Sequence, residues 1–200
     1  MNSTMKRLRA VLLSLLMSII LLLTGCGPKS LNTSVSSTPS KTNTSPSIIF
    51  PSGTDLAFNT IIGAHKVGGP YQDRAAQIRV LTDSQSASEV SGMVYSYDAD
   101  ILLKADYQHY IVVVVFNGWR VNISKYLEIQ KIWRSGNNVF VLAHFDDGGA
   151  TALQASSSQY QTVTLDRVQL IQTGEITFKL LDESGKERAT TMANITGIGK

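Results

Sequence analysis

Residues 110–116 (YIVVVVF) form a continuous apolar run dominated by β-branched side chains. Valine and isoleucine favour extended backbone because their branched Cβ packs well on a pleated surface. A strand with one face in water alternates apolar and polar residues, whereas this run has no polar face. We therefore expect a central strand that is covered on both faces.

Shorter segments around this run alternate in polarity and are bounded by turn residues, so they predict further strands. These segments are 56–62, 77–81, 126–133, 139–145, 161–170, 176–181 and 187–195. The turn at 135–138 joins 126–133 to 139–145, and the turn at 183–186 closes a final hairpin. Residues 146–158 are expected to be a loop.

Two details of this pattern can be tested residue by residue. The 126–133 segment needs a slip in phase to place both Ile129 and Ile132 in the core, and 161–170 places Val163, Leu165 and Val168 inward.

One helix is expected, and it starts at a cap on Thr82 or Asp83 and runs to about Tyr95, with Gln85 in the capping-box position. Its predicted apolar face consists of Val90, Met93, Val94 and Tyr97. Because strands and helices do not alternate, the pattern predicts an α+β fold. This fold is mainly antiparallel β, sandwich-like or half-barrel, with one helix after a disordered N-terminal tether.

The N-terminal 25 residues have the pattern of a secretory leader. Lys6, Arg7 and Arg9 precede the apolar run 10–23, which as a helix would be about 21 Å long, shorter than the ~30 Å hydrocarbon core of a bilayer. Leu23, Thr24 and Gly25 lead into Cys26, the only cysteine, and this Leu-Thr-Gly-Cys segment resembles a bacterial lipobox. The resemblance implies cleavage before Cys26 and lipid attachment to its thiol. The mature chain would then be held at the outer face of the cell membrane, or at an outer membrane, by its acyl chains.

Residues 27–54 contain thirteen Ser or Thr in 28 positions. Such a segment cannot bury enough apolar surface to offset its chain entropy, so we expect a disordered tether. The apolar triplet Ile48, Ile49 and Phe50 is the exception, and it is either a docking segment or a chance cluster. The domain prediction is a signal peptide at 1–25, a lipidated cysteine and tether at 26–54, and a β-rich domain at 55–200.

The charge and the cysteine content of the chain exclude several classes of protein. The chain has 18 Lys and Arg against 15 Asp and Glu. Three of the basic residues lie in the leader, so the mature chain is neutral and no nucleic-acid partner is expected. A single cysteine excludes a disulfide scaffold and a zinc-cysteine site.

The residues available for catalysis are few. The histidines are His65, His109 and His144, and no Gly-x-Ser-x-Gly elbow is present. The nearest alternative is a triad of His144, Asp146 and the serines at 156–158, but this spacing does not identify a catalytic site. The acidic segments 98–100 and 146–149 fit solvated turns better than calcium loops. We expect no enzyme activity, no metal and no cofactor.

Aromatic residues offer a better indication of function. Tyr107, Tyr110, Trp119, Tyr126 and Trp133 are expected to gather around the central strands. Tryptophan and arginine often anchor protein interfaces. Trp119, Arg120 and Tyr126 are therefore the candidate partner-binding residues, with the alternative that Trp119 caps the core and Arg120 faces water.

The stretch 58–195 resembles the PrcB-like family of bacterial extracytoplasmic proteins. The resemblance rests on four segments in this order. Val80-Leu81-Thr82-Asp83-Ser84 opens a helix, and a Val-rich strand then ends in Phe116-Asn117-Gly118. A turn leads into Tyr126-Leu127-Glu128-Ile129, and a later strand begins with Ser158-Gln159-Tyr160-Gln161-Thr162-Val163. The chain departs from the family pattern at Ser124-Lys125, where a Gly-Gly pair is usual, and at Gln159, where proline is frequent. The resemblance implies a non-catalytic module that supports or regulates an extracytoplasmic protease.

Two functional hypotheses follow from these observations. The first is a lipid-anchored envelope protein that binds a protein partner at the cell surface. The second is a lipoprotein that binds a small ligand or a glycan through the same aromatic residues, for which a concave aromatic pocket would be the favourable sign.

Overall fold

The computed structural model describes residues 48–63, 70–123, 127–145, 153–170 and 174–196, and for 120–123 and 153–157 it describes the backbone alone. The chain divides into the units Met1–Ser45 and Pro46–Lys200, and all described residues belong to the second. In these ranges no helix is long and apolar enough to cross a membrane.

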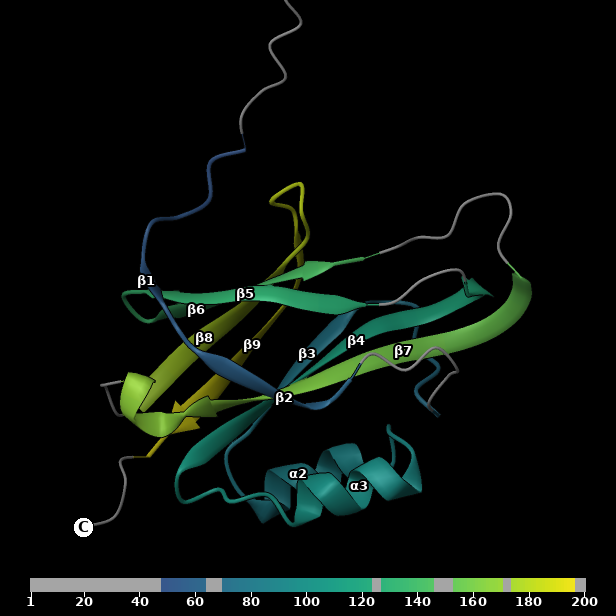
Figure 1. Cartoon of the computed structure of the whole chain (residues 1–200), viewed down its shortest axis with the longest axis horizontal. Coiled ribbons are helices and arrows are strands. Elements are labelled where there is room, and N and C mark those ends of the chain that lie inside the picture. Colours follow the sequence, from purple (N-terminus) through teal and green to yellow (C-terminus); the bar gives the residue numbers. More distant parts are fainter. Residues whose placement is uncertain (1–47, 64–69, 124–126, 146–152, 171–173, 197–200) are drawn as a thin grey trace, which may run out of the picture. The chain divides into compact units, whose positions relative to one another are not determined.

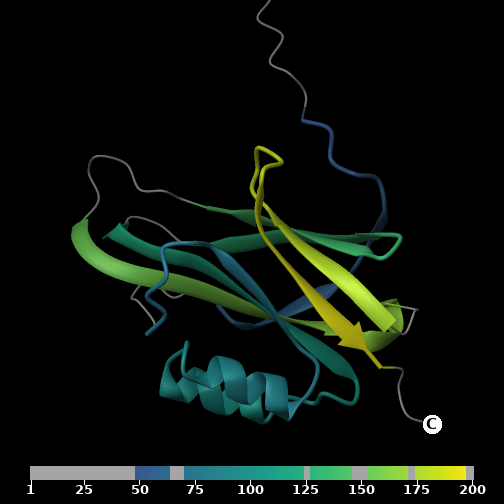
Figure 2. The same ribbon diagram turned by 180° about the vertical axis from the view of Figure 1, so that it is seen from behind.

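The described residues form two β-sheets, with a pair of helices on the outer face of one of them (Figures 1 and 2). The five-stranded sheet has the order β1 (Thr54–Asp55), β5 (Glu128–Ser135), β6 (Asn138–His144), β8 (Gly174–Leu181) and β9 (Glu187–Ile195). The four-stranded sheet has the order β2 (Phe58–Ile62), β7 (Leu153–Asp166), β4 (Tyr110–Ile123) and β3 (Gln77–Leu81). Neighbouring strands are antiparallel except for β6 and β8, which are parallel. The mainly antiparallel, two-sheet β fold is therefore confirmed.

Strand β4 is covered on both faces, as its sequence predicts. Alternate side chains enter the core between the sheets, while the others pack under the helices, so that every residue from Ile111 to Phe116 is fully buried. The first set is Ile111, Val113 and Val115, and the second is Val112, Val114 and Phe116. Burial of this kind contributes about 25 cal/mol per Å² of apolar surface, which makes β4 the centre of the domain.

The prediction of one helix ending near Tyr95 is wrong, because two short helices occupy this region. They are α2 (Ser84–Ser91) and α3 (Ser96–Leu103). Asp83 caps α2 as one of the two predicted alternatives, but the reciprocal capping-box residue is Ser86 and not Gln85. Helix α2 stops at Gly92, a residue with low helix propensity, and the chain turns before α3 starts.

The predicted phase slip in the 126–133 segment is confirmed as a β-bulge in β5. The register with β6 shifts between Ile129 and Lys131, and both Ile129 and Ile132 are buried. The Gln161 side chain, from the other sheet, accepts a hydrogen bond from the Ile129 N–H at 2.6 Å. This contact satisfies a buried donor within the core and joins the two sheets at one point.

Strand β7 differs from the prediction at both ends. Residues 153–158 belong to the strand and not to a loop, and the rest of the expected loop, 146–152, lies outside the described residues. At the other end the chain turns into the 3₁₀-helix η2 (Arg167–Leu170), which leaves Val168 59% exposed instead of inward. The Asp166 carboxylate accepts from the Val168 N–H and so favours the turn over a longer strand.

The apolar triplet near the start of the described chain docks mainly through Phe50. The Phe50 ring lies edge-on to Trp133, with centroids 5.9 Å apart, and the Trp133 indole N–H donates to the Pro51 carbonyl at 2.8 Å. Trp133 in turn stacks on Phe140. Ile49 is 89% exposed, whereas Ile48 is 50% exposed and its side chain lies beside Gly185. Residues 50–51 thus pack on the outer face of the five-stranded sheet, in a stretch that the composition assigns to the tether.

Candidate binding site beside helix α3

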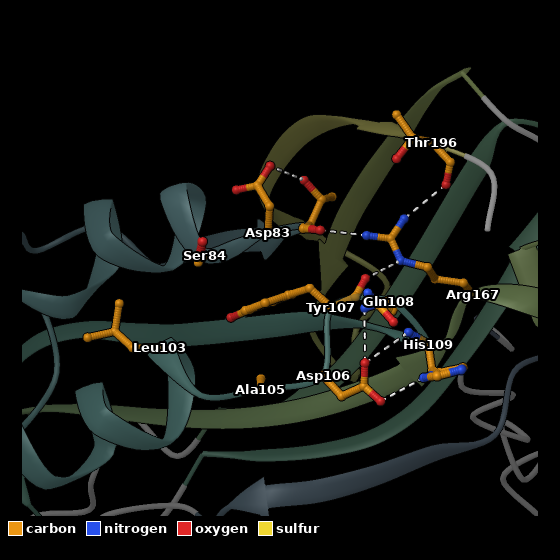
Figure 3. Close-up of a pocket in the computed structure, with 11 residues that line it drawn as sticks. Asp83, Ser84, Leu103, Ala105, Asp106, Tyr107, Gln108, His109, Arg167 and Thr196 are labelled. Atoms are coloured by element: carbon orange, nitrogen blue, oxygen red, sulfur yellow. Dashed lines mark hydrogen bonds and ion pairs between the residues drawn. The ribbon is translucent and has the colours of Figure 1, made fainter. Parts of the chain in front are cut away.

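The loop between α3 and β4, residues 104–109, separates two hollows in the surface. We call the hollow on the Arg167 side the arginine hollow; its volume is about 640 Å³ and it is shown in Figure 3. The one between α3 and β2 we call the tyrosine groove, with a volume of about 670 Å³. Ala105 and Asp106 contribute to both.

The loop is held in shape by Asp106. Its carboxylate accepts hydrogen bonds from the backbone N–H groups of Gln108 and His109, at 3.1 and 3.3 Å. It also lies 2.7 Å from the His109 Nδ1 atom (Figure 3). The hydrogen bond from His109 holds the pKa of Asp106 below its usual value, so the residue is ionised at neutral pH.

The arginine hollow contains a buried guanidinium that contacts backbone rather than a carboxylate. Arg167 is 8% exposed, and its Nε, Nη1 and Nη2 atoms donate to the carbonyl oxygens of Tyr107, Thr196 and Thr82, as Figure 3 shows. These carbonyls come from the α3–β4 loop, the residue after β9 and the residue after β3. Arg167 therefore joins three chain segments, and its role in this hollow is structural.

Two further polar side chains of the arginine hollow, those of Asp83 and Tyr107, form hydrogen bonds with the helices. The backbone N–H of Ser86 donates to Asp83 and lowers the pKa of that carboxyl. The Tyr107 hydroxyl donates to the Leu102 carbonyl at 2.7 Å, and burial raises the pKa of Tyr107 to about 12. The polar groups of this hollow thus make intramolecular contacts that stabilise the fold.

The tyrosine groove has one helical wall, one strand wall and a sheet floor. Tyr97 and Ile101 lie at i and i+4 on α3, and Lys104, the residue that caps its C-terminus, follows at i+7, so the three lie on one stripe. Opposite them are Asn59 and Ile61 of β2, and the floor contains Tyr110 and Thr164. The groove thus combines apolar surface with a few polar groups, a composition typical of binding sites.

The helical wall is fixed to the sheet by a buried polar contact. The Tyr160 hydroxyl, on β7, donates to the Asp98 carboxylate and accepts from the Tyr95 N–H at 3.1 Å. Asp98 is 4% exposed, and burial, more than the neighbouring Asp98, raises the pKa of Tyr160 far above its usual value. Because α3 is held in this way, the stripe on its other side is rigidly presented to the groove.

Tyr97 is a highly exposed aromatic residue of this wall. The sequence predicts Tyr97 on the apolar face of a single helix, but its side chain is 77% exposed. The reason is that the chain restarts at Ser96 as α3, which buries Asp98, Ala99 and Leu102 instead. The predicted acidic turn at 98–100 is for the same reason wrong: these residues are helical and Asp98 is buried.

The candidate partner-binding residues from the sequence lie elsewhere. Trp119 is half-buried on β4, after a bulge at Gly118 with φ of +79°, and its N–H donates to the Asp73 carbonyl at 2.6 Å. Arg120 is in β4 opposite Ser157, and nothing is described of its side chain. Tyr126 lies outside the described residues. Trp119 lines neither the hollow nor the groove.

The expected aromatic cluster is split along the fold. Tyr107 and Tyr110 are at the start of β4, whereas Trp119 follows nine residues later, about 30 Å away at the rise of an extended strand. Trp133 is on the outer face of the five-stranded sheet with Phe50 and Phe140. Of the four that the structure describes, Tyr110 alone lines the tyrosine groove.

His109 and His144, the two histidines that the structure describes, have different partners, Asp106 and Glu183. His144 Nδ1 is 2.6 Å from the Glu183 carboxylate, which also accepts from Gln130, and the hydrogen bond from His144 lowers the pKa of Glu183. His65 and Asp146 lie outside the described residues. In the described part of the chain no group of three or more His, Cys, Asp or Glu residues is placed to hold a metal ion.

The lipobox residues Leu23, Thr24, Gly25 and Cys26 lie outside the described residues. No protein-family model, curated protein or solved structure matches this chain. The resemblance to the PrcB-like family therefore remains a prediction from the residues quoted for it.

Proposed function

We propose that this chain is a non-catalytic protein-binding module, held at the outer face of a bacterial envelope membrane by lipid on Cys26. The basic leader, the apolar run and the Leu-Thr-Gly-Cys segment support the anchor, and the Ser/Thr-rich stretch supports a spacer between membrane and domain. The similarity to PrcB-like proteins favours an extracytoplasmic protease, or a complex that contains one, as the partner.

The tyrosine groove is the observation on which this proposal rests. A tyrosine ring that is 77% exposed on a well-fixed helix can bury large area with little loss of side-chain entropy. Ile61, Ile101 and Tyr110 continue the apolar surface into the groove, while the charged groups of Asp100 and Lys104 lie on α3. An apolar centre with a polar rim is the usual composition of a protein interface.

The anchor is tested by the intact mass of the native protein after extraction with detergent. We expect loss of residues 1–25 and a mass increase that corresponds to acylation at Cys26. In the Cys26→Ser variant the protein should leave the membrane fraction. An unmodified cysteine in the native protein would contradict the anchor.

The binding role is tested by comparing matched variants in crosslinked, detergent-solubilised envelopes. We expect Tyr97→Ala to lose a partner that the parent protein captures reproducibly. Met192→Ala should keep it, because Met192 is 64% exposed and apolar but lies outside the groove. Trp119→Ala tests the alternative surface near the other end of β4. Capture that depends on Trp119 and not on Tyr97 would assign the interface to the surface near Trp119 and contradict its assignment to the tyrosine groove.

A second candidate function, binding of a small ligand or glycan, is favoured by the concave shape of the same groove. Its volume of about 670 Å³ is within the range of small-molecule sites, and Asn59, Asp100 and Thr164 offer hydrogen-bonding groups beside Tyr97 and Tyr110. Saturation-transfer NMR with envelope oligosaccharides distinguishes the two functions. Transfer to sugar protons that disappears in Tyr97→Ala would favour the ligand, and its absence would favour the protein partner.

A further inference from the structure

We propose that the tyrosine groove and the edge of β2 together bind an extended segment of the partner, which adds to β2 as a fifth strand and places a basic side chain in the groove. This inference rests on the proposed protein-binding function and specifies the chemistry of the partner.

The backbone of β2 supplies the first argument. Among the strands that the structure describes, β2 is the outermost of its sheet, and it pairs with β7 on one side. An edge strand presents backbone N–H and C=O groups that an added strand can satisfy. Recognition of this kind obtains affinity from backbone hydrogen bonds and specificity from pockets for alternate side chains.

The groove lies where those alternate side chains would enter. Phe58 packs against the core between the sheets, whereas Asn59 and Ile61 face the groove. A strand added beside β2 would lie about 4.8 Å from it, with every second side chain on the helix side of the sheet. Those side chains would meet Tyr97, Ile101 and Lys104 on α3.

The lengths of the two walls agree with a short segment. β2 has 5 residues and spans about 17 Å at 3.4 Å per residue. Helix α3 has 8 residues and spans about 12 Å. A segment of about five extended residues would thus cover β2 and place two or three side chains against the helix.

The charge of the groove indicates which charge the bound side chain of the partner should carry. Two carboxylates, Asp100 and Asp106, and one ammonium, Lys104, line it, so its formal charge is negative. Lys104 is 4.0 Å from Asp100 and both side chains are largely exposed, so this ion pair is weak and can be replaced. A lysine or arginine of the partner placed near Asp100 and Asp106 would complement this charge, with apolar residues at the neighbouring inward positions.

The test is selection from a random dodecapeptide display library against the full chain in detergent. We expect enriched peptides in which every second residue is apolar or basic. For the best peptide, binding should weaken about tenfold or more in Tyr97→Ala and stay unchanged in Met192→Ala. Asp100→Lys should reduce the preference for a basic residue. Methylation of alternate backbone nitrogens in that peptide should also weaken binding about tenfold, because it removes donors to β2 and keeps the side chains.

Hydrogen exchange of the β2 amides gives an independent measurement. On binding, amides of residues 58–62 should become protected, including ones that exchange rapidly in the free chain. Enrichment of peptides with helical i, i+4 spacing, equal binding by the methylated peptide, unchanged exchange at 58–62, or no enrichment would each overturn strand addition. The Tyr97-dependent capture of an envelope protein would still stand in those cases, so this inference and the proposed function fail separately.

Discussion

Replacement of Arg167 is expected to destabilise the domain strongly, although Arg167 contacts no other side chain through a hydrogen bond in the part of the chain that the structure describes. Its guanidinium donates to the carbonyls of Tyr107, Thr196 and Thr82 at 2.9, 3.0 and 2.5 Å. Arg167→Met keeps a long apolar side chain but leaves these three acceptors without their donor.

The expected loss of stability in Arg167→Met follows from the number of hydrogen bonds lost and the cost of burying the guanidinium charge. A hydrogen bond to a charged group contributes about 1.5–3 kcal/mol, so three give a gross contribution of about 4.5–9 kcal/mol. Burial of the guanidinium costs several kcal/mol, which the variant avoids, and water in the hollow can reach the carbonyls. We therefore expect a net loss of about 3 kcal/mol, equivalent to a decrease in Tm of roughly 6–12 °C for a domain of this size.

The assay is thermal unfolding of the purified protein, followed by circular dichroism. The Tm of Arg167→Lys should be close to that of Arg167→Met, because one ammonium group cannot reach three carbonyls arranged around a planar guanidinium. Arg79→Met is the matched control, since Arg79 is exposed on β3. If Arg167→Met melts within about 2 °C of the parent protein, the three contacts contribute little and the structural role assigned to Arg167 is wrong.

Three further perturbations test other parts of the structure. Tyr160→Phe removes the hydroxyl that fixes α3 and should cost about 1–3 kcal/mol of unfolding free energy in denaturant titrations, whereas Tyr110→Phe should change it by less than about 0.5 kcal/mol. Gly118→Ala should destabilise more than Gly136→Ala in the same assay: both have positive φ, but only at Gly118 would the new Cβ meet backbone, at 2.4 Å from a carbonyl oxygen. Because the pKa of Asp83 is lowered on folding, its ionised form stabilises the domain above the unfolded-state value of 3.8, and this contribution is lost as the pH falls through the lower folded-state pKa. The stability difference between the parent and Asp83→Asn should shrink over that interval, and a constant difference would contradict the assignment.

The sequence predicts most strands because their signals are local. The β-branched run identifies β4, and the phase slip between Ile129 and Ile132 identifies the bulge in β5. The second helix has no such signal, since its buried face includes Asp98, whose burial depends on Tyr160, a residue 62 positions later in the chain. A charged residue that is buried through a distant partner looks like a solvated turn when only its neighbours are considered.

The candidate groove is less predictable for the same reason. Its walls come from β2, α3, β4 and β7, and the residues that meet there, such as Asn59 and Thr164, are more than a hundred positions apart. Tyr97 and Tyr110 are visible as aromatic residues in the sequence, but their neighbours follow from the sheet order. Trp119, which the residue type favours, lies at the other end of β4.

The parallel pairing of β6 with β8 has a consequence for how the chain acquires its structure. Between these two strands the chain leaves one sheet, contributes β7 to the other, and then returns. The five-stranded sheet is therefore completed only after β7 has been synthesised, and contacts between segments distant in sequence make folding slow. A nascent chain that ends before Gly174 lacks β8 and β9, so we expect the domain to form in one cooperative step only after these two strands have been synthesised.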